Sequence, residues 1–341
     1  MSRRIITSIG VSIAAILGNT AGAGNDAVFV PSVGHEEHCL AMFGQTSSQA
    51  YVRVPGTFCY RDGDQRELAR QYWQYAVLSD AVYLDDSKTI REPPDIEASI
   101  AKCCPEAAIG WSKRWRRWTA FPNVDFVEFA ARHGLYLEVW SNDSDRSVVV
   151  VMRGTEFTSL VDWLANFRWV RISRFFPGFN DQYSDISTKF AELFVDELAN
   201  QYPDLDVKIY ATGHSLGGGL AQHFAYSVAP LTSDGKPVPR VSQVFAFNPS
   251  PVTGWSSVRD TVIRDANAEK LHIHRIFEHG EILAYPRRLI GYVVTPKAEK
   301  PAIWEIRFNY LDSGDTVGSH SMQALSCSLI NSAFAPDNDP K

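Results

Sequence analysis

The chain alternates between short runs rich in β-branched and other apolar residues and longer segments whose apolar residues recur with a helical period. The expected strands are Leu135–Trp140, Ser147–Met152, Val207–Thr212, Val241–Phe247, Leu271–Phe277 and Ile303–Tyr310. The expected helices are Asp64–Leu84, Asp125–His133, Asp181–Gln201, Leu216–Ala229, Ser257–Ala268 and Ser321–Ala333. Such alternation is typical of an α/β fold with a mostly parallel central sheet flanked by helices.

The segment before the first helix lacks this alternation. Residues 24–64 are predicted to be irregular, with strand fragments such as Tyr51–Val54. The length of 341 residues would allow two domains. Because neither an internal repeat nor a long low-complexity linker divides the chain, we expect one domain over residues 65–341, preceded by an irregular N-terminal extension over residues 24–64.

The first residues have the pattern of a secretory signal peptide. Arg3 and Arg4 precede the uncharged apolar run Ile5–Leu17, and small residues at 21–23 follow, as at a cleavage site. The run is shorter than the about 20 residues that span a bilayer. We therefore expect residues 1–23 to be removed and the protein to be secreted, to the periplasm or outside the cell. An amphipathic or disordered leader is the alternative.

Composition narrows the function classes. Hydrophobic residues make up 45% of the chain and charged residues 21%, which excludes a wholly disordered or fibrous protein. The net charge of -6 argues against a nucleic-acid partner, because proteins that bind nucleic acids normally present a basic surface.

The five cysteines bear on the expected export, since disulfides form in oxidising compartments. An odd number leaves at least one thiol unpaired within the chain. We expect Cys39 to pair with Cys59, and Cys103 or Cys104 to pair with Cys327; buried free thiols are the alternative. The chain has no pair of C-x-x-C motifs, so a structural zinc site is not expected.

One segment places a serine between a strand and a helix. The expected strand from Val207 runs into the sequence G-H-S-L-G at 213–217, and the next helical pattern begins there. A sharp strand-to-helix turn holds such a serine in a strained conformation and projects its hydroxyl above the sheet. Gly213 and Gly217 fit because strand and helix crowd each other at the turn. Ser215 is therefore the candidate nucleophile.

A serine nucleophile needs a histidine as general base, and in α/β-hydrolases the order along the chain is serine, acid, histidine. The histidines after Ser215 are His223, His272, His274, His279 and His320. His223 lies on the helix that leaves the turn, and the next two lie in an expected strand. His320 lies in a loop that opens the last helix, so we expect it to be the base; a helix-capping or surface role is the alternative.

The acid that orients the histidine should lie in a loop directly after a strand. Glu281 follows the expected strand Leu271–Phe277 and is our first candidate, with Glu278 as the second. Asp312 and Asp315 are weaker candidates. A pair of solvated surface glutamates is the alternative interpretation.

Three sequence blocks resemble the class 3 (fungal-type) lipase family of α/β-hydrolases. The strand at 148–152 ends in R-G-T at 153–155, D-W-L-A-N follows at 162–166, and G-H-S-L-G-G at 213–218 matches the family's nucleophile turn. The block at 275–286 and the helix start at His320 are similar to the family segments that supply the acid and the base.

The resemblance implies roles for particular residues. Ser215 would be the nucleophile, His320 the base and Glu281 the acid, and the backbone N–H groups of Thr155 and Leu216 would form the oxyanion hole. Glutamate stands where the family usually has aspartate, and the family's H-x-G-F appears at 176–179 as F-P-G-F. Because every reacting group is a protein group, neither a cofactor nor a metal is implied.

The segment after Thr155 has one apolar helix face. This face consists of Phe157, Leu160, Val161, Trp163, Leu164 and Phe167. In the family this position holds a lid that opens at a lipid surface, so these residues are lid candidates. A permanently docked core helix is the alternative.

A second aromatic cluster lies within a basic segment. Trp111, Trp115 and Trp118 have spacings of four and three residues, which predicts a shared helical face, and Lys113, Arg114, Arg116 and Arg117 flank them. Transient contact with an anionic membrane surface is one interpretation. Core packing of the tryptophans beneath a solvated basic rim is the interpretation that we favour.

These observations predict a secreted serine hydrolase that cleaves carboxylic esters of lipids at a lipid–water interface, similar to a triacylglycerol lipase. A phospholipase A1 or lysophospholipase, delivered as a toxin with a neutralising partner, is the alternative enzyme. A catalytically silent hydrolase fold used for binding is the alternative from another class. The sequence names no protein partner.

Overall fold

The computed structural model describes most of the predicted domain and parts of the predicted extension. The described residues are 28–35, 37–38, 49–84, 95–133, 135–154, 182–251, 253–283, 300–311, 316 and 318–336. The predicted signal peptide lies outside them. Among these residues, no helix is both long and apolar enough to cross a membrane.

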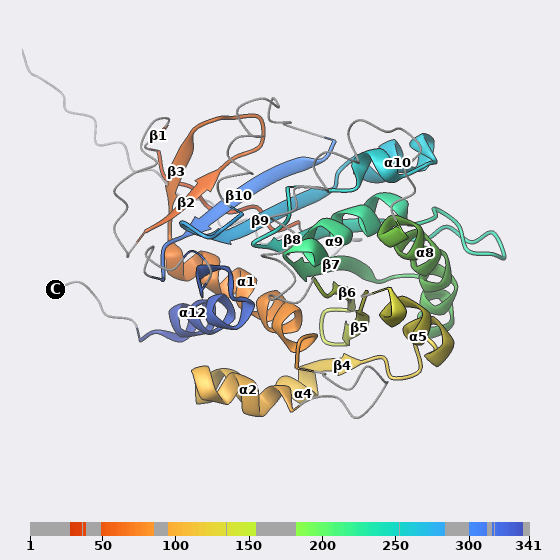
Figure 1. Ribbon diagram of the computed structural model, residues 1–341, viewed down its shortest axis with the longest axis horizontal. Helices are drawn as coiled ribbons and strands as arrows, with labels where there is room; N and C mark the ends of the chain where they lie inside the picture. Colours follow the sequence, from red (N-terminus) through yellow and green to blue (C-terminus); the bar gives the residue numbers. More distant parts are fainter. Residues whose placement is uncertain are drawn as a thin grey trace, which may run out of the picture.

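One ten-stranded sheet organises the described part of the chain, in the spatial order β1-β3-β2-β10-β9-β8-β7-β6-β5-β4 (Figure 1). The strands are β1 (Glu37–His38), β2 (Ala50–Arg53), β3 (Tyr60–Gly63), β4 (Trp115–Arg117), β5 (Leu137–Asn142), β6 (Ser147–Met152), β7 (Lys208–His214), β8 (Val241–Phe247), β9 (His272–Glu278) and β10 (Ala302–Phe308). Strands β6 to β10 are parallel, and antiparallel strands extend the sheet on both sides. This is the expected α/β-hydrolase architecture with a parallel centre.

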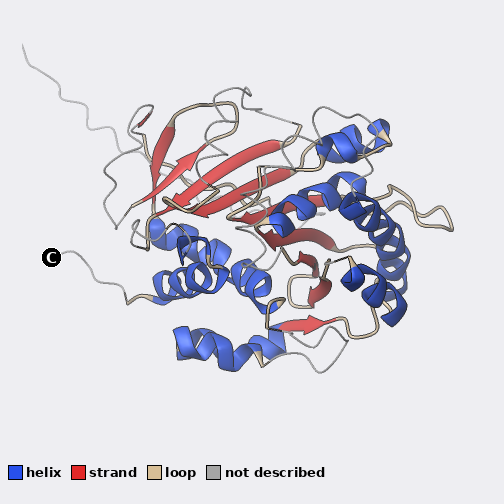
Figure 2. Ribbon diagram, viewed as in Figure 1, coloured by secondary structure: helices blue, strands red, loops and turns tan. Residues whose placement is uncertain are grey.

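Helices cover both faces of the sheet (Figure 2). They are α1 (Gln65–Ala81), α2 (Ile96–Cys103), α3 (Pro105–Ala108), α4 (Trp111–Arg114), α5 (Val124–Arg132), α8 (Gln182–Gln201), α9 (Leu216–Ser227), α10 (Thr261–Ala268) and α12 (Met322–Phe334), with 3₁₀ turns η1 (Trp255–Ser257) and η2 (Gly318–His320). Helices α5, α8, α9 and α10 pack on one face, and α1 to α4 and α12 pack on the other. The central strands are buried on both sides, which explains their continuous apolar runs.

Local chemistry sets several helix starts where the sequence predicts them. The Asp64 side chain accepts a hydrogen bond from the backbone N–H of Glu67 at the start of α1, and Ser321 caps α12 in the same way. Such N-caps satisfy backbone donors that have no partner within the helix. The predicted strands at 147–152 and 241–247 have the observed bounds of β6 and β8.

The tryptophan-rich segment is not one helix, so the shared helical face predicted for it is wrong. Helix α4 ends at Arg114, and Trp115 begins the edge strand β4. In extended backbone, residues an odd number of positions apart point to opposite faces. Accordingly, Trp111 and Trp115 join the core beneath α1, whereas Trp118 joins the core beneath α8.

Part of the predicted extension enters the main sheet. Strand β2 pairs antiparallel with β10, and β3 pairs with β2. The fragment predicted at Tyr51–Val54 corresponds to β2. Burial of Ala50 and Val52 against α1 joins this segment to the same core. The boundary between residues 64 and 65 stays a prediction.

A disulfide joins Cys103 to Cys327, which confirms one of the two pairings predicted from sequence. It ties the end of α2 to α12, across 224 residues of sequence. Cys104 is free. Cys59 is disulfide-bonded, but Cys39 lies outside the described residues, so the pairing of Cys39 with Cys59 stays a prediction.

Candidate active site

Ser215 lies at the carboxyl end of β7, where the chain turns sharply into α9. Its backbone has φ 57° and ψ −122°, a conformation that non-glycine residues rarely adopt. Three backbone hydrogen bonds hold it there: its N–H donates to the Phe247 carbonyl at 2.9 Å, and its carbonyl accepts from the N–H groups of Ser250 at 2.9 Å and Gly218 at 3.1 Å. The strained backbone between β7 and α9 is the conformation expected of a nucleophile turn, and the role of Ser215 as the nucleophile stays a prediction.

The two glycines of the motif allow this turn to approach the neighbouring strand. A Cβ atom on Gly217 would lie 2.1 Å from the Met152 carbonyl oxygen, and one on Gly213 would lie 2.5 Å from the Gly217 carbonyl oxygen. Neither distance is sterically possible, and both obstacles are backbone atoms that cannot rotate away. Glycine is required at both positions because β6, β7 and α9 pack closely together here.

The fold brings His320 and Glu281 together. His320 lies in η2, just before α12, and its Nδ1 is 2.7 Å from Oε2 of Glu281, which follows β9. The side chains are 1% and 0% exposed. The same Oε2 accepts a hydrogen bond of 2.8 Å from the backbone N–H of Leu283, which fixes the carboxylate. A buried carboxylate facing Nδ1 favours an imidazole whose Nε2 can accept a proton.

His320 also lies beside the nucleophile turn. Nε2 of His214, the residue before Ser215, is 2.8 Å from the His320 carbonyl oxygen, and the two imidazole centres are 4.7 Å apart. Ser215 is 1% exposed, and its Oγ has no hydrogen-bond partner in the described part of the chain. Serine, histidine and carboxylate therefore occupy one buried region at the carboxyl ends of β7 and β9.

Glu278, the second acid candidate, has a different environment. Its Oε1 accepts backbone hydrogen bonds of 2.7 Å from Tyr310 and 3.0 Å from Leu311, after β10. Burial raises the pKa of Glu278 to about 7, against the lowering effect of these hydrogen bonds. Glu278 therefore ties two loops together rather than facing the imidazole. Asp312 and Asp315 lie outside the described residues.

Three other histidines after Ser215 in the sequence have contacts or burial unrelated to Glu281. His223 is buried in α9, and burial lowers its pKa to about 4. His274 in β9 meets the Tyr72 hydroxyl at 3.1 Å, and burial lowers its pKa to about 3. His272, also in β9, is 3.3 Å from the indole nitrogen of Trp304.

Of the two predicted oxyanion donors, Leu216 lies among the described residues and Thr155 does not. Leu216 is the first residue of α9, where backbone N–H groups have no partner within the helix. Thr155 lies outside the described residues, but Gly154 before it packs against the turn: a Cβ atom there would lie 3.1 Å from the Ser215 Cβ. The lid candidates Phe157, Leu160, Trp163, Leu164 and Phe167 also lie outside the described residues.

Comparisons with known proteins find one family of similar sequences and a set of similar folds. Residues 149–284 match the family model described as Lipase (class 3). The matched stretch runs from within β6 to the loop after β9 and includes the turn around Ser215. The match supports hydrolysis of lipid esters as the activity. A comparison with curated protein sequences finds no match.

Solved structures of fungal lipases are similar to this chain. The native Rhizomucor miehei lipase propeptide complex is 17% identical, with 85% of this chain and 89% of that chain covered and a TM-score of 0.43. Lip2 lipase from Yarrowia lipolytica is 16% identical, with coverages of 79% and 95% and a TM-score of 0.42. The lipase from Rhizopus microsporus var. chinensis is 14% identical, with coverages of 88% and 96% and a TM-score of 0.38.

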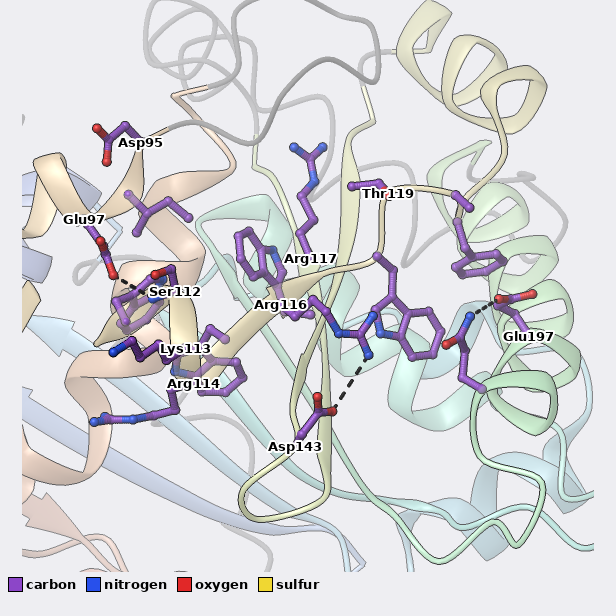
Figure 3. Close-up of a pocket in the computed structure, with 18 residues that line it drawn as sticks. Asp95, Glu97, Ser112, Lys113, Arg114, Arg116, Arg117, Thr119, Asp143 and Glu197 are labelled. Atoms are coloured by element: carbon purple, nitrogen blue, oxygen red, sulfur yellow. Dashed lines mark hydrogen bonds and ion pairs between the residues drawn. The ribbon is translucent and has the colours of Figure 1, made fainter. Parts of the chain in front are cut away.

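A cavity of about 660 Å³ lies far from Ser215, beside the edge strand β4 (Figure 3). Trp115 of β4 pairs with Asn142, which pairs with Ser147, which pairs with Lys208 at the start of β7. Ser215 follows the other end of β7, about 20 Å along the strand. The cavity is therefore not the place where Ser215 would meet an ester.

The basic tryptophan-rich segment forms much of the lining of this cavity. Trp111, Trp115 and Trp118 are only 3–5% exposed, so their indoles pack in the core, as the favoured interpretation expects. Four cationic and four acidic side chains surround the cavity (Figure 3): Lys113, Arg114, Arg116, Arg117, Asp95, Glu97, Asp143 and Glu197. Since these charges balance, the lining favours neither anionic nor cationic ligands.

Sequence reasoning missed one residue that holds the site together. Asn248, directly after β8, accepts a hydrogen bond on Oδ1 from the Glu278 N–H, and its Nδ2 is 3.4 Å from the His320 carbonyl oxygen. It therefore links the loops that carry the acid and the histidine. A polar residue directly after a buried strand was the available signal, but such residues also occur in ordinary turns.

Proposed function

We propose that the protein is a serine hydrolase of lipid carboxylic esters that works through an acyl-enzyme on Ser215. The observation that carries the proposal is the buried contact of 2.7 Å between His320 and Glu281 beside a strained serine at the start of a helix. The family match over residues 149–284 supports lipid esters as the substrate class.

Acylation begins when Ser215 Oγ attacks the ester carbonyl carbon. As the new C–O bond forms, the hydroxyl proton passes to Nε2 of His320, and the carbonyl oxygen becomes an oxyanion. The N–H groups of Leu216 and Thr155 are the proposed oxyanion donors, and each such donor contributes a factor of about 10²–10³ to kcat. The alcohol leaves with the proton from His320.

Deacylation repeats these steps with water. His320 takes a proton from the attacking water, and the tetrahedral intermediate collapses to release the fatty acid and restore the serine hydroxyl. Throughout, Glu281 accepts the Nδ1–H hydrogen bond and stabilises the imidazolium that forms in each half-reaction. The glutamate fills the role that the family usually gives to aspartate.

Burial of the reacting groups bears on substrate access. Ser215 is 1% exposed and Leu216 is 7% exposed, so little of the nucleophile turn is open to solvent. We propose that the apolar segment at 157–167 is the lid, on the strength of its sequence pattern, and we expect activation at a lipid surface. Secretion remains part of the proposal on the strength of the apolar N-terminal pattern at 1–23.

The first test is Ser215→Ala, assayed on a soluble p-nitrophenyl ester. The variant should lose hydrolysis to the level of the uncatalysed reaction while keeping the circular dichroism spectrum of the wild type. Ser227→Ala, at the other end of α9, is the matched control and should keep wild-type turnover, since its Oγ contacts His223 one turn earlier in the same helix. Turnover by Ser215→Ala would refute the mechanism.

The second test identifies the lipid class. Emulsified triolein and phosphatidylcholine vesicles are offered to the wild type under the same conditions, and fatty-acid release is titrated. Preference for triolein supports a triacylglycerol lipase. Preference for vesicles would replace it by the phospholipase A1 or lysophospholipase alternative. Absence of release from lipids and from the soluble ester would favour the catalytically silent binding protein.

A further inference from the structure

Two side chains outside the proposed triad connect the strand end that precedes the oxyanion residue to the loop that carries the general base. The Tyr83 hydroxyl, in the turn after α1, is 3.0 Å from the Gly154 backbone nitrogen and 3.1 Å from Nδ1 of His214. The other ring nitrogen of His214, Nε2, is 2.8 Å from the His320 carbonyl oxygen. These contacts form one continuous chain of hydrogen bonds from Gly154 to His320, which we name the Tyr83–His214 link.

The chemistry of its ends determines the direction of the two outer hydrogen bonds in the link, and a neutral His214 ring then sets the direction of the middle one. The backbone N–H of Gly154 can only donate, and the carbonyl oxygen of His320 can only accept. Nε2 of His214 must therefore carry a proton. In the neutral ring Nδ1 then lacks one and accepts the Tyr83 hydroxyl proton, while the Tyr83 oxygen accepts from Gly154.

Packing restricts both members of the link. The Arg153 guanidinium lies 5.1 Å from the centre of the Tyr83 ring and 4.7 Å from that of Tyr136. A Cβ atom on Gly154 would lie 2.8 Å from the Tyr83 hydroxyl and 2.4 Å from the His214 carbonyl oxygen. The space around the link therefore accepts only glycine at position 154, which gives a physical reason for the glycine of the R-G-T block.

We propose that Tyr83 and His214 are positioning residues, which hold the oxyanion strand and the general-base loop at a fixed separation through a neutral His214 with its proton on Nε2. The proposal rests on the proposed function of Ser215 and His320. Active sites need such restraint because a displacement of about 1 Å can lower turnover about 100-fold. Neither residue touches the reacting atoms in this account, so neither is a catalytic residue.

Tyr83→Phe removes the hydroxyl and little else. Turnover of a soluble p-nitrophenyl ester should fall about tenfold in kcat, with KM changed less than twofold, because the variant displaces reacting groups without altering the surface that binds the ester. The matched control is Tyr72→Phe. Tyr72 lies on α1, and its hydroxyl also meets a histidine Nδ1 at 3.1 Å, that of His274 in β9.

The control separates positioning from loss of stability. Tyr72→Phe loses a buried Tyr–His hydrogen bond, whereas Tyr83→Phe loses a part-buried one together with the hydrogen bond from the Gly154 N–H, so both variants should lower the melting temperature. Only Tyr83→Phe should lose turnover. Equal loss of turnover by both variants, or a Tyr83→Phe variant within twofold of the wild type, would overturn the proposal.

Two amides at position 214 test the two ends of the link separately. In His214→Gln the amide nitrogen occupies roughly the place of Nε2 and can still donate to His320, whereas in His214→Asn the amide oxygen occupies roughly the place of Nδ1 and can still accept from Tyr83. Adding Tyr83→Phe should cause a smaller further loss in His214→Gln, which has already lost the acceptor of the Tyr83 proton, than in His214→Asn, which keeps it. Additive losses in both backgrounds would overturn the link.

A spectroscopic readout is independent of any substrate. Nitrogen-15 NMR of histidine-labelled protein at neutral pH, with the His214 signals assigned by their absence in His214→Gln, should show a protonated Nε2 and an unprotonated Nδ1. The opposite tautomer, or a doubly protonated ring, would overturn the proposal. If the wild type hydrolyses no ester, the proposed function fails. The spectrum would still decide whether the Tyr83–His214 link exists.

Discussion

Replacing Glu281 by glutamine preserves the shape of the side chain and removes the negative charge that faces His320. Glu281 Oε2 accepts hydrogen bonds from His320 Nδ1 at 2.7 Å and from the Leu283 N–H at 2.8 Å. An amide oxygen at the same place can accept both. The variant therefore isolates the contribution of the charge to the proposed reaction.

The size of the effect follows from the distance and the burial. When His320 takes the proton from Ser215, a positive imidazolium forms beside the carboxylate, with charge centres about 4 Å apart. At an effective dielectric constant of about 20, two unit charges at this separation attract by about 4 kcal/mol. Since each 1.36 kcal/mol is a factor of ten in rate, Glu281→Gln should lower kcat by about 10³.

The assay is steady-state hydrolysis of a p-nitrophenyl ester at neutral pH, with Glu278→Gln as the matched control. Glu278 is an equally buried glutamate three residues earlier, and burial raises its pKa to about 7. An amide is therefore a close substitute for its partly protonated carboxyl group. Glu278→Gln should keep kcat within tenfold of the wild type.

Two outcomes would refute this reasoning. Glu281→Gln with more than a tenth of wild-type kcat would show that the carboxylate does not stabilise the imidazolium. Equal losses in Glu281→Gln and Glu278→Gln would show that any disturbance of the loop after β9 lowers activity, without a special role for Glu281.

Three further predictions concern stability. Gly217→Ala should yield little folded protein on expression, because its Cβ would lie 2.1 Å from the Met152 carbonyl oxygen; a soluble variant with the wild-type melting temperature would contradict the packing argument. The raised pKa of Glu278, about 7 against 4.5 in the unfolded chain, makes the folded state hold a proton that the unfolded state releases. Its contribution to stability is thus fully present below pH 4.5 and is lost as pH rises through 7, by up to about 3 kcal/mol. Urea unfolding should therefore show a free energy of unfolding that decreases between these pH values. In Glu278→Gln this decrease should be smaller. Joint replacement of Cys103 and Cys327 by serine should lower the free energy of unfolding by about 2–5 kcal/mol, measured by denaturant unfolding without reductant, whereas an unchanged value would mean that the cross-link does not constrain the unfolded chain.

Elements whose signals are local were predicted well. The apolar runs at 147–152 and 241–247 coincide with β6 and β8, because strands buried on both faces need apolar residues at every position. The start of α12 follows from the Ser321 cap. These features depend on residues a few positions apart, and the sequence displays them directly.

Elements that depend on distant partners were not predicted. The spacing of Trp115 from Trp111 predicts a helix, yet Trp115 begins β4. The edge strand forms here because it pairs with the backbone of β5. Tyr83 and Asn248 have no motif of their own. Each becomes informative only when the fold brings it to within hydrogen-bond distance of residues far away in sequence.

The sequence by itself determined the α/β alternation, the glycine-bounded turn around Ser215 and the resemblance to class 3 lipases. It could not distinguish Glu281 from Glu278, since both are glutamates in the same short segment after one strand. The tertiary structure separates them: Gly280 turns the chain at φ 75°, so that Glu281 meets His320 while Glu278 meets the backbone after β10. The physical reason is that a side chain's partner depends on the direction in which the backbone presents it, and long-range packing decides that direction.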